Sequence, residues 1–465
     1  MAFCSQGAIE SDSLVPMSKT YRAWDVDQEW LLPPSIHDFV SADHPAHLLR
    51  EIVRTELDLS AIFAAYEREL RGFPPYHPAM MVALLLYAYS RGVYSSRAIA
   101  RGCEERLDFM AVTALQRPDF RTVSDFRKRH LAALGALFGQ VLGLCRTAGL
   151  VRLGHVALDG SKLKANASKH KAMSYGRMQG RAEQLQAEIE GWLAEAERAD
   201  AAEDAELGEA RGDEMPAWVA DKQQRLAKIR EAKAALEAEA EAPPVADDGP
   251  GPSSGMMDKG RPKRAVDGGP PARAQRNFTD PDSRILKTRD GFVQGYNGQI
   301  AVDGHRQVIA AHRLTTNGAD HDALAPLVDD TVRHCRRKPR EVSADAGFCN
   351  DDNLAALETR RIAGYLMPGR ARHDKPGDTG RRRLAPDSRM ARMEAKLRRA
   401  GRRSRYRLRK QIVEPVFGQI KQARGFRQFL LRGFQKVRHE WALICTVHNL
   451  TKLLGHRTAA DHANA

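Results

Sequence analysis

The sequence predicts an α/β protein: a mixed β-sheet with helices on its faces, preceded by an all-helical region and interrupted by an inserted helical hairpin. Apolar residues recur at helical spacing through residues 21–150, which indicates a bundle of amphipathic helices. From residue 151 onward, segments of strand character alternate with helical ones, as in a sheet covered by helices. Residues 181–242 interrupt this alternation with a sequence rich in alanine and glutamate, which favours helix.

The composition narrows the possible functions. The chain has 465 residues, enough for two or three domains, and a formal net charge of +14. Such an excess of positive charge predicts attraction to polyanions such as nucleic acid. The six cysteines are scattered without any Cys-x-x-Cys pair, which argues against a zinc site and a disulfide scaffold and fits a reducing cytosol. No signal peptide is evident, and we expect no association with membranes.

The helical region follows residues 1–20, which resemble a loose tail. Residues 79–89 form the longest apolar stretch, which is too short to span a bilayer and predicts a buried helix. A basic helix is expected to begin near Ser96. Thr122 is followed three residues later by Asp125, which resembles a capping box and predicts the start of a further helix.

That last helix has a distinct apolar and a distinct cationic side. It should place Phe126, Leu131 and Leu134 inside, and its outer face should bear the cations Arg127, Lys128 and Arg129. Two interpretations remain open, a solvated helical bundle or a DNA-binding helical domain, because charge alone does not distinguish them.

The insertion has two apolar stripes of helical spacing, one formed by Leu185, Ile189, Trp192 and Leu193, the other by Leu226, Ile229, Ala232 and Leu236. Two antiparallel helices joined by a turn are the simplest arrangement for residues 181–242. Residues 243–275 are rich in glycine, proline and serine, which predicts a disordered linker. The apolar stripes make the hairpin a candidate for contact between two copies of the chain.

The predicted sheet is built from segments on both sides of the insertion. Residues 151–160 have strand character, and residues 292–303 and 307–314 read as a hairpin that turns at Asp303-Gly304. Two more strands and three more helices follow; the strands span residues 341–346 and 362–367, and the helices span residues 321–335, 352–360 and 437–454.

Three acidic residues stand where catalytic carboxylates are expected. Asp159 and Asp345 each end an apolar stretch, and Glu414 lies in a basic, helix-like segment. Taken singly, Asp159 is also typical of a turn, Asp345 of a cap, and Glu414 of an exposed helix. Taken together, two strand ends and a late helix can converge on one point, where carboxylate oxygens bind hard divalent metals such as Mg²⁺.

Several longer motifs, in order, make the chain resemble the bacterial insertion-sequence transposases of the DDE type. The resemblance rests on residues 159–170, 277–284, 295–297, 344–348, 413–421 and 424–427. It implies a ribonuclease-H-like catalytic core, formed by residues 151–180 and 276–425. It also implies a helical DNA-binding domain at residues 21–150 and leaves residues 426–465 as a C-terminal helical segment.

The resemblance also implies roles for individual residues. Asp159, Asp345 and Glu414 would be the catalytic residues and would hold two Mg²⁺ ions, with Mn²⁺ as a possible substitute. Lys421, seven residues after Glu414, would contact a phosphate beside the metals, although it could also be an ordinary solvated lysine. Further contacts with DNA are expected from Tyr406, Arg409, Lys410, Lys162, Lys164, Arg127 and Arg129.

Two local features affect these expectations. Pro415 disfavours the helical region for Glu414, so a helix should start or kink near that residue. His321 lies between two aspartates, but a helix cap by Asp320 explains this better than a metal site. The basic run at residues 370–410 is either a flexible loop or a segment that follows the DNA backbone.

The function expected from the resemblance is cleavage at the ends of an insertion sequence followed by strand transfer into target DNA. The partners would be double-stranded DNA, as terminal inverted repeats and target, and a second copy of the chain on that DNA. The expected location is the bacterial cytoplasm, with the nucleoid when DNA is bound. The alternatives are a metal-dependent nuclease of the same fold and an inactive DNA-binding descendant.

Overall fold

The structure is a computed structural model that describes residues 35–66, 74–207, 217–241, 269–288, 291–368 and 385–464. The predicted tail, most of the predicted linker and residues 370–384 of the basic run lie outside these ranges. The first described region is all-helical, as expected. Its helices are α1 (Ile36–Phe39), α2 (Pro45–Thr55), α3 (Ser60–Phe63), α4 (Pro78–Ser90), α5 (Ser96–Glu105), α6 (Leu107–Thr113), α7 (Phe120–Arg129) and α8 (Leu131–Thr147).

One predicted helix start in this region is wrong. Helix α7 begins at Phe120, because Asp119 is its N-cap and accepts hydrogen bonds from the backbone amides of Arg121 and Thr122. Thr122 therefore lies inside the helix. The helix starts directly after Asp119 because this side chain binds the first backbone amides of the helix, which lie upstream of the Thr122–Asp125 pair.

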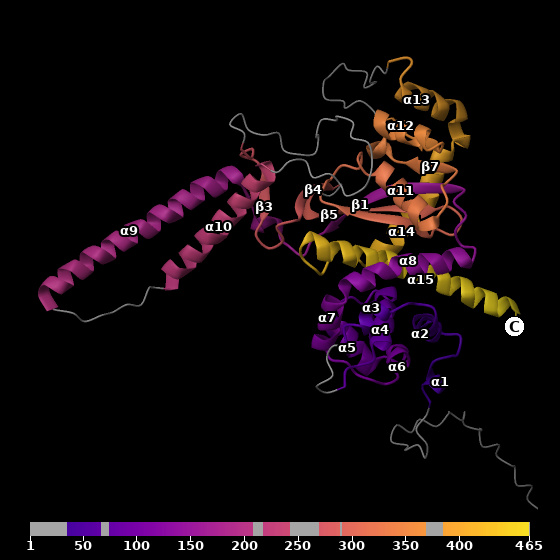
Figure 1. Ribbon diagram of the computed structural model, residues 1–465, viewed down its shortest axis with the longest axis horizontal. Coiled ribbons are helices and arrows are strands. Elements are labelled where there is room, and N and C mark those ends of the chain that lie inside the picture. Colours follow the sequence, from indigo (N-terminus) through magenta and orange to yellow (C-terminus); the bar gives the residue numbers. More distant parts are fainter. Residues whose placement is uncertain are drawn as a thin grey trace, which may run out of the picture.

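The sheet has six strands with mixed directions (Figure 1). Strands β6, β5 and β1 are antiparallel neighbours, and β7 and β8 continue from β1 in parallel. Strand β4 pairs with the first part of β5. The strands are β1 (His155–Lys164), β4 (Arg284–Thr288), β5 (Gly291–Asp303), β6 (Ile309–Thr315), β7 (Glu341–Ala344) and β8 (Ala363–Leu366).

Strand β1 is longer than its apolar sequence suggests. Its buried half ends at Leu158, but pairing with β5 continues to Lys164, so Asp159 lies within the strand instead of at its end. Pairing with β7 stops earlier, because Leu158 opposes Ala344, the last residue of β7. One edge of β1 is therefore free of strand pairing from Asp159 until the bridge between Lys164 and Gln428, next to the point where Asp345 leaves β7.

Helices cover both faces of the sheet. Trp441 packs against Gly298 on one face, which places α14 (Leu408–Gly418) and α15 (Phe434–Asn464) there. Arg313, opposite Gln299 in the sheet, pairs with Asp330 of α11 (Leu324–Cys335) on the other face. Helices α12 (Asp351–Thr359) and α13 (Arg389–Ala400) pack beside β8.

Helix α14 passes through Pro415, so the expected start near Glu414 is wrong. Pro415 lacks an N–H to donate to the carbonyl of Gln411. Gln307 supplies the missing donor, because its Nε2 lies 3.0 Å from that carbonyl oxygen. A π-helical turn at Gln419–Ala423 follows directly and includes Lys421.

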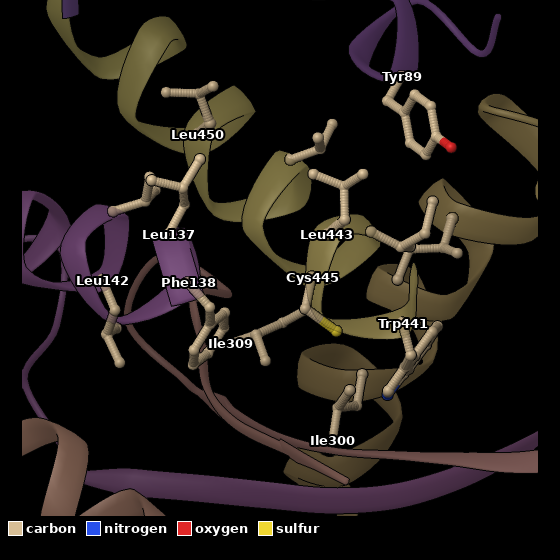
Figure 2. Packing of buried hydrophobic residues seen from close by; sticks show 14 of the residues in the cluster. Tyr89, Leu137, Phe138, Leu142, Ile300, Ile309, Trp441, Leu443, Cys445 and Leu450 are labelled. Atoms are coloured by element: carbon tan, nitrogen blue, oxygen red, sulfur yellow. The ribbon is translucent and has the colours of Figure 1, made fainter. Parts of the chain in front are cut away.

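The hydrophobic core is continuous from the N-terminal helices into the sheet. Figure 1 shows α8 and α15 side by side between the other N-terminal helices and the sheet, and the two helices are in extensive contact. Figure 2 shows Phe138 of α8 beside Ile309 of β6 and Cys445 of α15, and Leu137 on the side of Leu450 of α15. The boundary expected at residue 150 therefore does not separate two independent cores.

The inserted segment forms the predicted hairpin of two helices, α9 (Tyr175–Leu207) and α10 (Ala217–Glu241), which extends away from the body (Figure 1). Its base rests on a two-stranded sheet of β2 (Ala172–Ser174) and β3 (Gln275–Asn277). Leu185 and Ile189 pack with the α10 stripe in a separate small core. Leu185, Ile189 and the α10 stripe are therefore used within the hairpin itself.

No helix among the described residues combines the length and the apolar character needed to cross a membrane.

Candidate active site

The two predicted aspartates start from adjacent positions, where β1 and β7 part. Asp159 follows Leu158 on β1, and Asp345 follows Ala344 on β7, so both occupy the next place in the same register. Asp345 Oδ1 accepts a hydrogen bond from the backbone amide of Gly347 at 2.9 Å. The parting of the strands therefore leaves space for both side chains at one edge of the sheet.

Glu414 reaches the same place from α14, and Arg409 connects it to Asp159. The guanidinium of Arg409 lies 3.3 Å from Asp159 Oδ2 and 3.4 Å from Glu414 Oε1. The Arg409 and Asp159 side chains are mostly buried, whereas that of Glu414 is 47% exposed. Asp159 and Glu414 thus share one cation of the protein itself, and the charge of Arg409 also acts on Asp345.

Lys421 also lies beside this cluster. Its Nζ donates hydrogen bonds to Ser161 Oγ and to the Lys162 carbonyl on β1, two and three residues beyond Asp159. Burial lowers the pKa of Lys421, while the negative charge of Asp159 acts in the opposite direction. Lys421 is therefore a partly buried cation next to the carboxylates, unlike an ordinary solvated lysine.

The structure distinguishes between the two cations that precede Glu414. Arg409 faces the carboxylates, and its guanidinium carbon lies 5.9 Å from the centre of the Tyr406 ring. Lys410 is exposed. Tyr406 and Arg409 therefore belong to the site, whereas Lys410 lies on the surface of the same helix.

Sequence reasoning missed one carboxylate, Asp320. The predicted helix cap is wrong, because α11 begins at Leu324 with Ala323 as its N-cap residue and without a side-chain cap. Asp320 Oδ1 instead accepts hydrogen bonds from Asn297 Nδ2 at 2.7 Å and Gln299 Nε2 at 2.8 Å. The available signal in the sequence was the pair Asn297 and Gln299, two amides at alternate positions of an otherwise apolar strand, which need a buried acceptor such as a carboxylate.

The donor set suits a hard divalent cation, because all of its acidic ligands offer oxygen. No three histidine, cysteine or acidic side chains in the described part of the chain are already arranged around one metal position. In this arrangement the Arg409 guanidinium pairs with both Asp159 and Glu414. A buried acceptor without a partner, Asn297 Oδ1, adjoins the same site.

Two family models match this chain, and together they cover more than half of it. Residues 34–129 match a transposase domain (DUF772), and residues 271–450 match the transposase DDE domain. The chain belongs to the DDE transposases. No curated protein and no solved structure matches it. Asp345 and Glu414 lie within the matched DDE region, and Asp159 lies before it, separated by the inserted hairpin.

Family membership establishes the general activity. The protein is a DNA transposase, an enzyme that binds DNA and depends on a divalent metal. The nuclease and inactive alternatives are not favoured, because transposase domains match on both sides of the insertion.

The other cations expected to contact DNA differ in their exposure. Lys164 and Arg129 are exposed, and Lys162 Nζ donates a hydrogen bond to the Lys287 carbonyl at 2.7 Å. The expectation that Arg127 lies on the outer face of its helix is wrong. It is 7% exposed and donates to Tyr89 Oη, the Tyr94 carbonyl and Ser96 Oγ.

We expect Arg127→Ala to destabilise the transposase by about 2–3 kcal/mol, because it leaves buried acceptors without their charged donor. The free energy of unfolding in urea measures this. The control is Arg129→Ala, which should change stability by less than about 0.5 kcal/mol because Arg129 is exposed. An Arg127→Ala protein as stable as its parent but weaker in DNA binding would contradict the structural role.

The electrostatics of the site predict a pH dependence for metal binding. Burial raises the pKa of Asp159 to about 7, against the opposing charge of Arg409, and the charge of Asp345 adds to the increase. Burial also raises the pKa of Asp345, and Asp320 contributes to this shift. Because a carboxylate must lose its proton to bind a metal, protons compete with the metal below the pKa.

We therefore expect Mn²⁺ affinity, measured by calorimetry without DNA, to fall roughly tenfold per pH unit below about pH 7. The same raised pKa affects folding in the opposite direction, because it makes the folded protein more stable at low pH than at high pH. A raised pKa means that the folded state holds the proton more tightly than the unfolded chain. The stabilisation is complete below the ordinary pKa of 3.8 and is lost as the pH rises towards 7. An affinity independent of pH between about 6 and 7 would contradict a carboxylate with this pKa.

Proposed function

We propose that this transposase cuts DNA at the terminal inverted repeats of its own insertion sequence and joins the ends to target DNA, using two Mg²⁺ ions. The observation on which this depends is the convergence of Asp159, Asp345 and Glu414 from two strands and a helix. We further propose that the catalytic core is ribonuclease-H-like. The order of three antiparallel strands followed by two parallel ones, with acids at the central strands, supports this.

Asp159, Asp345 and Glu414 are the residues that would hold the metals, with Mn²⁺ as a possible replacement. Bound Mg²⁺ ions supply Lewis-acid activation of the attacking oxygen and stabilisation of the departing one. Arg409 pairs with two of the carboxylates in the present arrangement, at 3.3 and 3.4 Å. Its release from them would leave the acids free for metal and make the guanidinium available to a DNA phosphate.

The remaining cations position the DNA in this proposal. Lys421 lies beside Asp159 through its bonds to Ser161 and Lys162, so it can contact the phosphate next to the reacting one. Tyr406 supports the Arg409 guanidinium from one side. Lys164 and Lys410 are exposed and would add affinity for the backbone without sequence information, as would Arg129 and Lys162.

Transposition brings two DNA ends together, so we propose that two copies of the chain act on paired ends. The inserted hairpin is not assigned to this contact, since Leu185, Ile189 and the α10 stripe pack against each other. We also propose that the enzyme acts in the bacterial cytoplasm, with the nucleoid, because its substrate is DNA.

A strand-transfer assay tests the proposed function. Labelled duplexes from the DNA that flanks the coding region, chosen for short inverted repeats, are incubated with supercoiled target and either Mg²⁺ or EDTA. We expect metal-dependent cleavage at the repeats and joined products of higher mass. Cleavage without any joined product would instead support the nuclease alternative.

A further inference from the structure

Asp320 lies in the connection between β6 and α11, and two buried amides hold it in place. Asn297 and Gln299 are 0% and 2% exposed, and both donate to Asp320 Oδ1. They occupy alternate positions of β5, so both side chains leave the strand on the same face. Two buried donors directed at a single oxygen atom fix the orientation of this carboxylate.

Strand β1 leaves room for this arrangement at the residue next to Asp159. A Cβ at Gly160 would lie 2.5 Å from Asp320 Oδ1, closer than real Cβ atoms approach, and 3.0 Å from Asn297 Oδ1. The absence of a side chain at Gly160 therefore lets Asp320 approach β1. Because successive residues of a strand face opposite sides, Asp320 and Arg409 approach β1 from opposite faces.

The orientation of the Asn297 amide is determined by its neighbours. Its nitrogen faces two acceptors, Asp320 Oδ1 and the Asn317 carbonyl at 3.2 Å. Its oxygen is therefore directed towards the gap beside Gly160, where it is buried without a hydrogen-bond donor. A buried acceptor without a partner indicates a missing donor or cation at this position.

The second oxygen of Asp320 is the one that lies near Gly347, in the turn that follows Asp345. No donor among the described residues bonds to Asp320 Oδ2, which lies 3.7 Å from the position of a Gly347 Cβ. Asp345 Oδ1 lies 3.1 Å from that same position. The free oxygen of Asp320 and the predicted metal ligand Asp345 thus flank one point.

We propose that Asp320 is a fourth carboxylate of the metal centre, which binds the cation shared with Asp345 through Oδ2 while Asn297 and Gln299 hold Oδ1. This inference rests on the proposed metal-dependent function. The competing interpretation is a purely structural link between β5 and the β6–α11 connection. The two interpretations differ in one requirement: only metal binding needs a negative charge on Asp320 Oδ2.

Asp320→Asn separates these interpretations. Its side-chain oxygen can still accept from Asn297 and Gln299, but the charge on the second oxygen is lost. We expect about 10–100-fold weaker Mn²⁺ binding to the DNA-free protein, followed by the paramagnetic resonance of free Mn²⁺, with an unchanged unfolding transition in the absence of metal. Asp322→Asn is the matched control, since its side chain is 75% exposed, and it should bind Mn²⁺ like the parent.

Unaltered Mn²⁺ binding by Asp320→Asn would overturn the proposal. Asp345→Asn in the same titration tests the underlying function: if it too leaves Mn²⁺ binding unchanged, both ideas fail, and if it alone weakens binding, only the role of Asp320 fails.

Iron-mediated cleavage of the unmodified chain provides a second measurement if Asp320→Asn does not fold. With hydrogen peroxide as oxidant and ascorbate as reductant, bound Fe²⁺ should cut the chain near residue 320 as well as near residues 159 and 345. Cuts near 159 and 345 without one near 320 would also overturn the proposal.

Discussion

Asp345→Asn should lower cleavage at the element ends roughly 10³-fold, equivalent to about 4 kcal/mol of transition-state stabilisation. Asparagine can still accept the hydrogen bond from the Gly347 amide, so the turn after β7 should keep its shape. What the substitution removes is the charge that a metal requires. The measurement is the rate of cleavage of a labelled duplex under single-turnover conditions.

DNA binding should remain close to that of the parent, because Asp345 adds no positive charge to the protein surface. Asp352→Asn is the control, an exposed acid at the start of α12 that should leave the cleavage rate unchanged. If Asp345→Asn cleaves DNA at the parent rate, Asp345 is not a metal ligand and the proposed site is wrong.

The largest expected effect on stability comes from Trp441→Ala, which should lower the free energy of unfolding by about 3–5 kcal/mol. Trp441 is 0% exposed and stacks on Phe417 of α14, with ring centres 6.5 Å apart. Its indole also fills the space above Gly298 on β5, where a Cβ would approach it to 3.0 Å. Alanine would leave a cavity between the sheet and the helix that positions Glu414.

Urea unfolding measured by circular dichroism tests this prediction. Gln435→Ala, at an exposed position near the start of the same helix, should change stability by less than about 0.5 kcal/mol. Because α15 also packs on α8 and α4, we expect the N-terminal helices and the sheet to unfold together in the parent. Two well-separated transitions in the parent would show that α15 does not unite the two regions.

The sequence predicted the elements of the fold more reliably than their ends. Periodicity is a local property, so the α4 helix, the β5–β6 hairpin and the inserted α9–α10 pair were accessible from residue patterns. The position where a helix begins depends on which side chain accepts hydrogen bonds from its first backbone amides. Asp119 does so for α7, one turn before the predicted capping box.

The direction of individual charged side chains was less accessible. Arg127 and Arg129 lie two residues apart on one helix, yet the first is buried among tyrosines and the second is exposed. Arg409 and Lys410 are adjacent, and only Arg409 contacts the carboxylates. Charge patterns identify a cationic segment. Which of its cations is buried or paired depends on a partner in a distant part of the chain, such as Asp159 for Arg409.

By itself, the sequence predicted most of the helices and strands in their order and singled out Asp159, Asp345 and Glu414 as candidate acids, because these are encoded in short stretches of residues; strand β4 and helix α13 were not predicted. The tertiary structure alone decided that Asp159 lies within β1, that Arg409 spans two of the acids, and that Asp320 adjoins them. The physical reason is that each of these arrangements depends on where strands part and on contacts between residues more than a hundred positions apart.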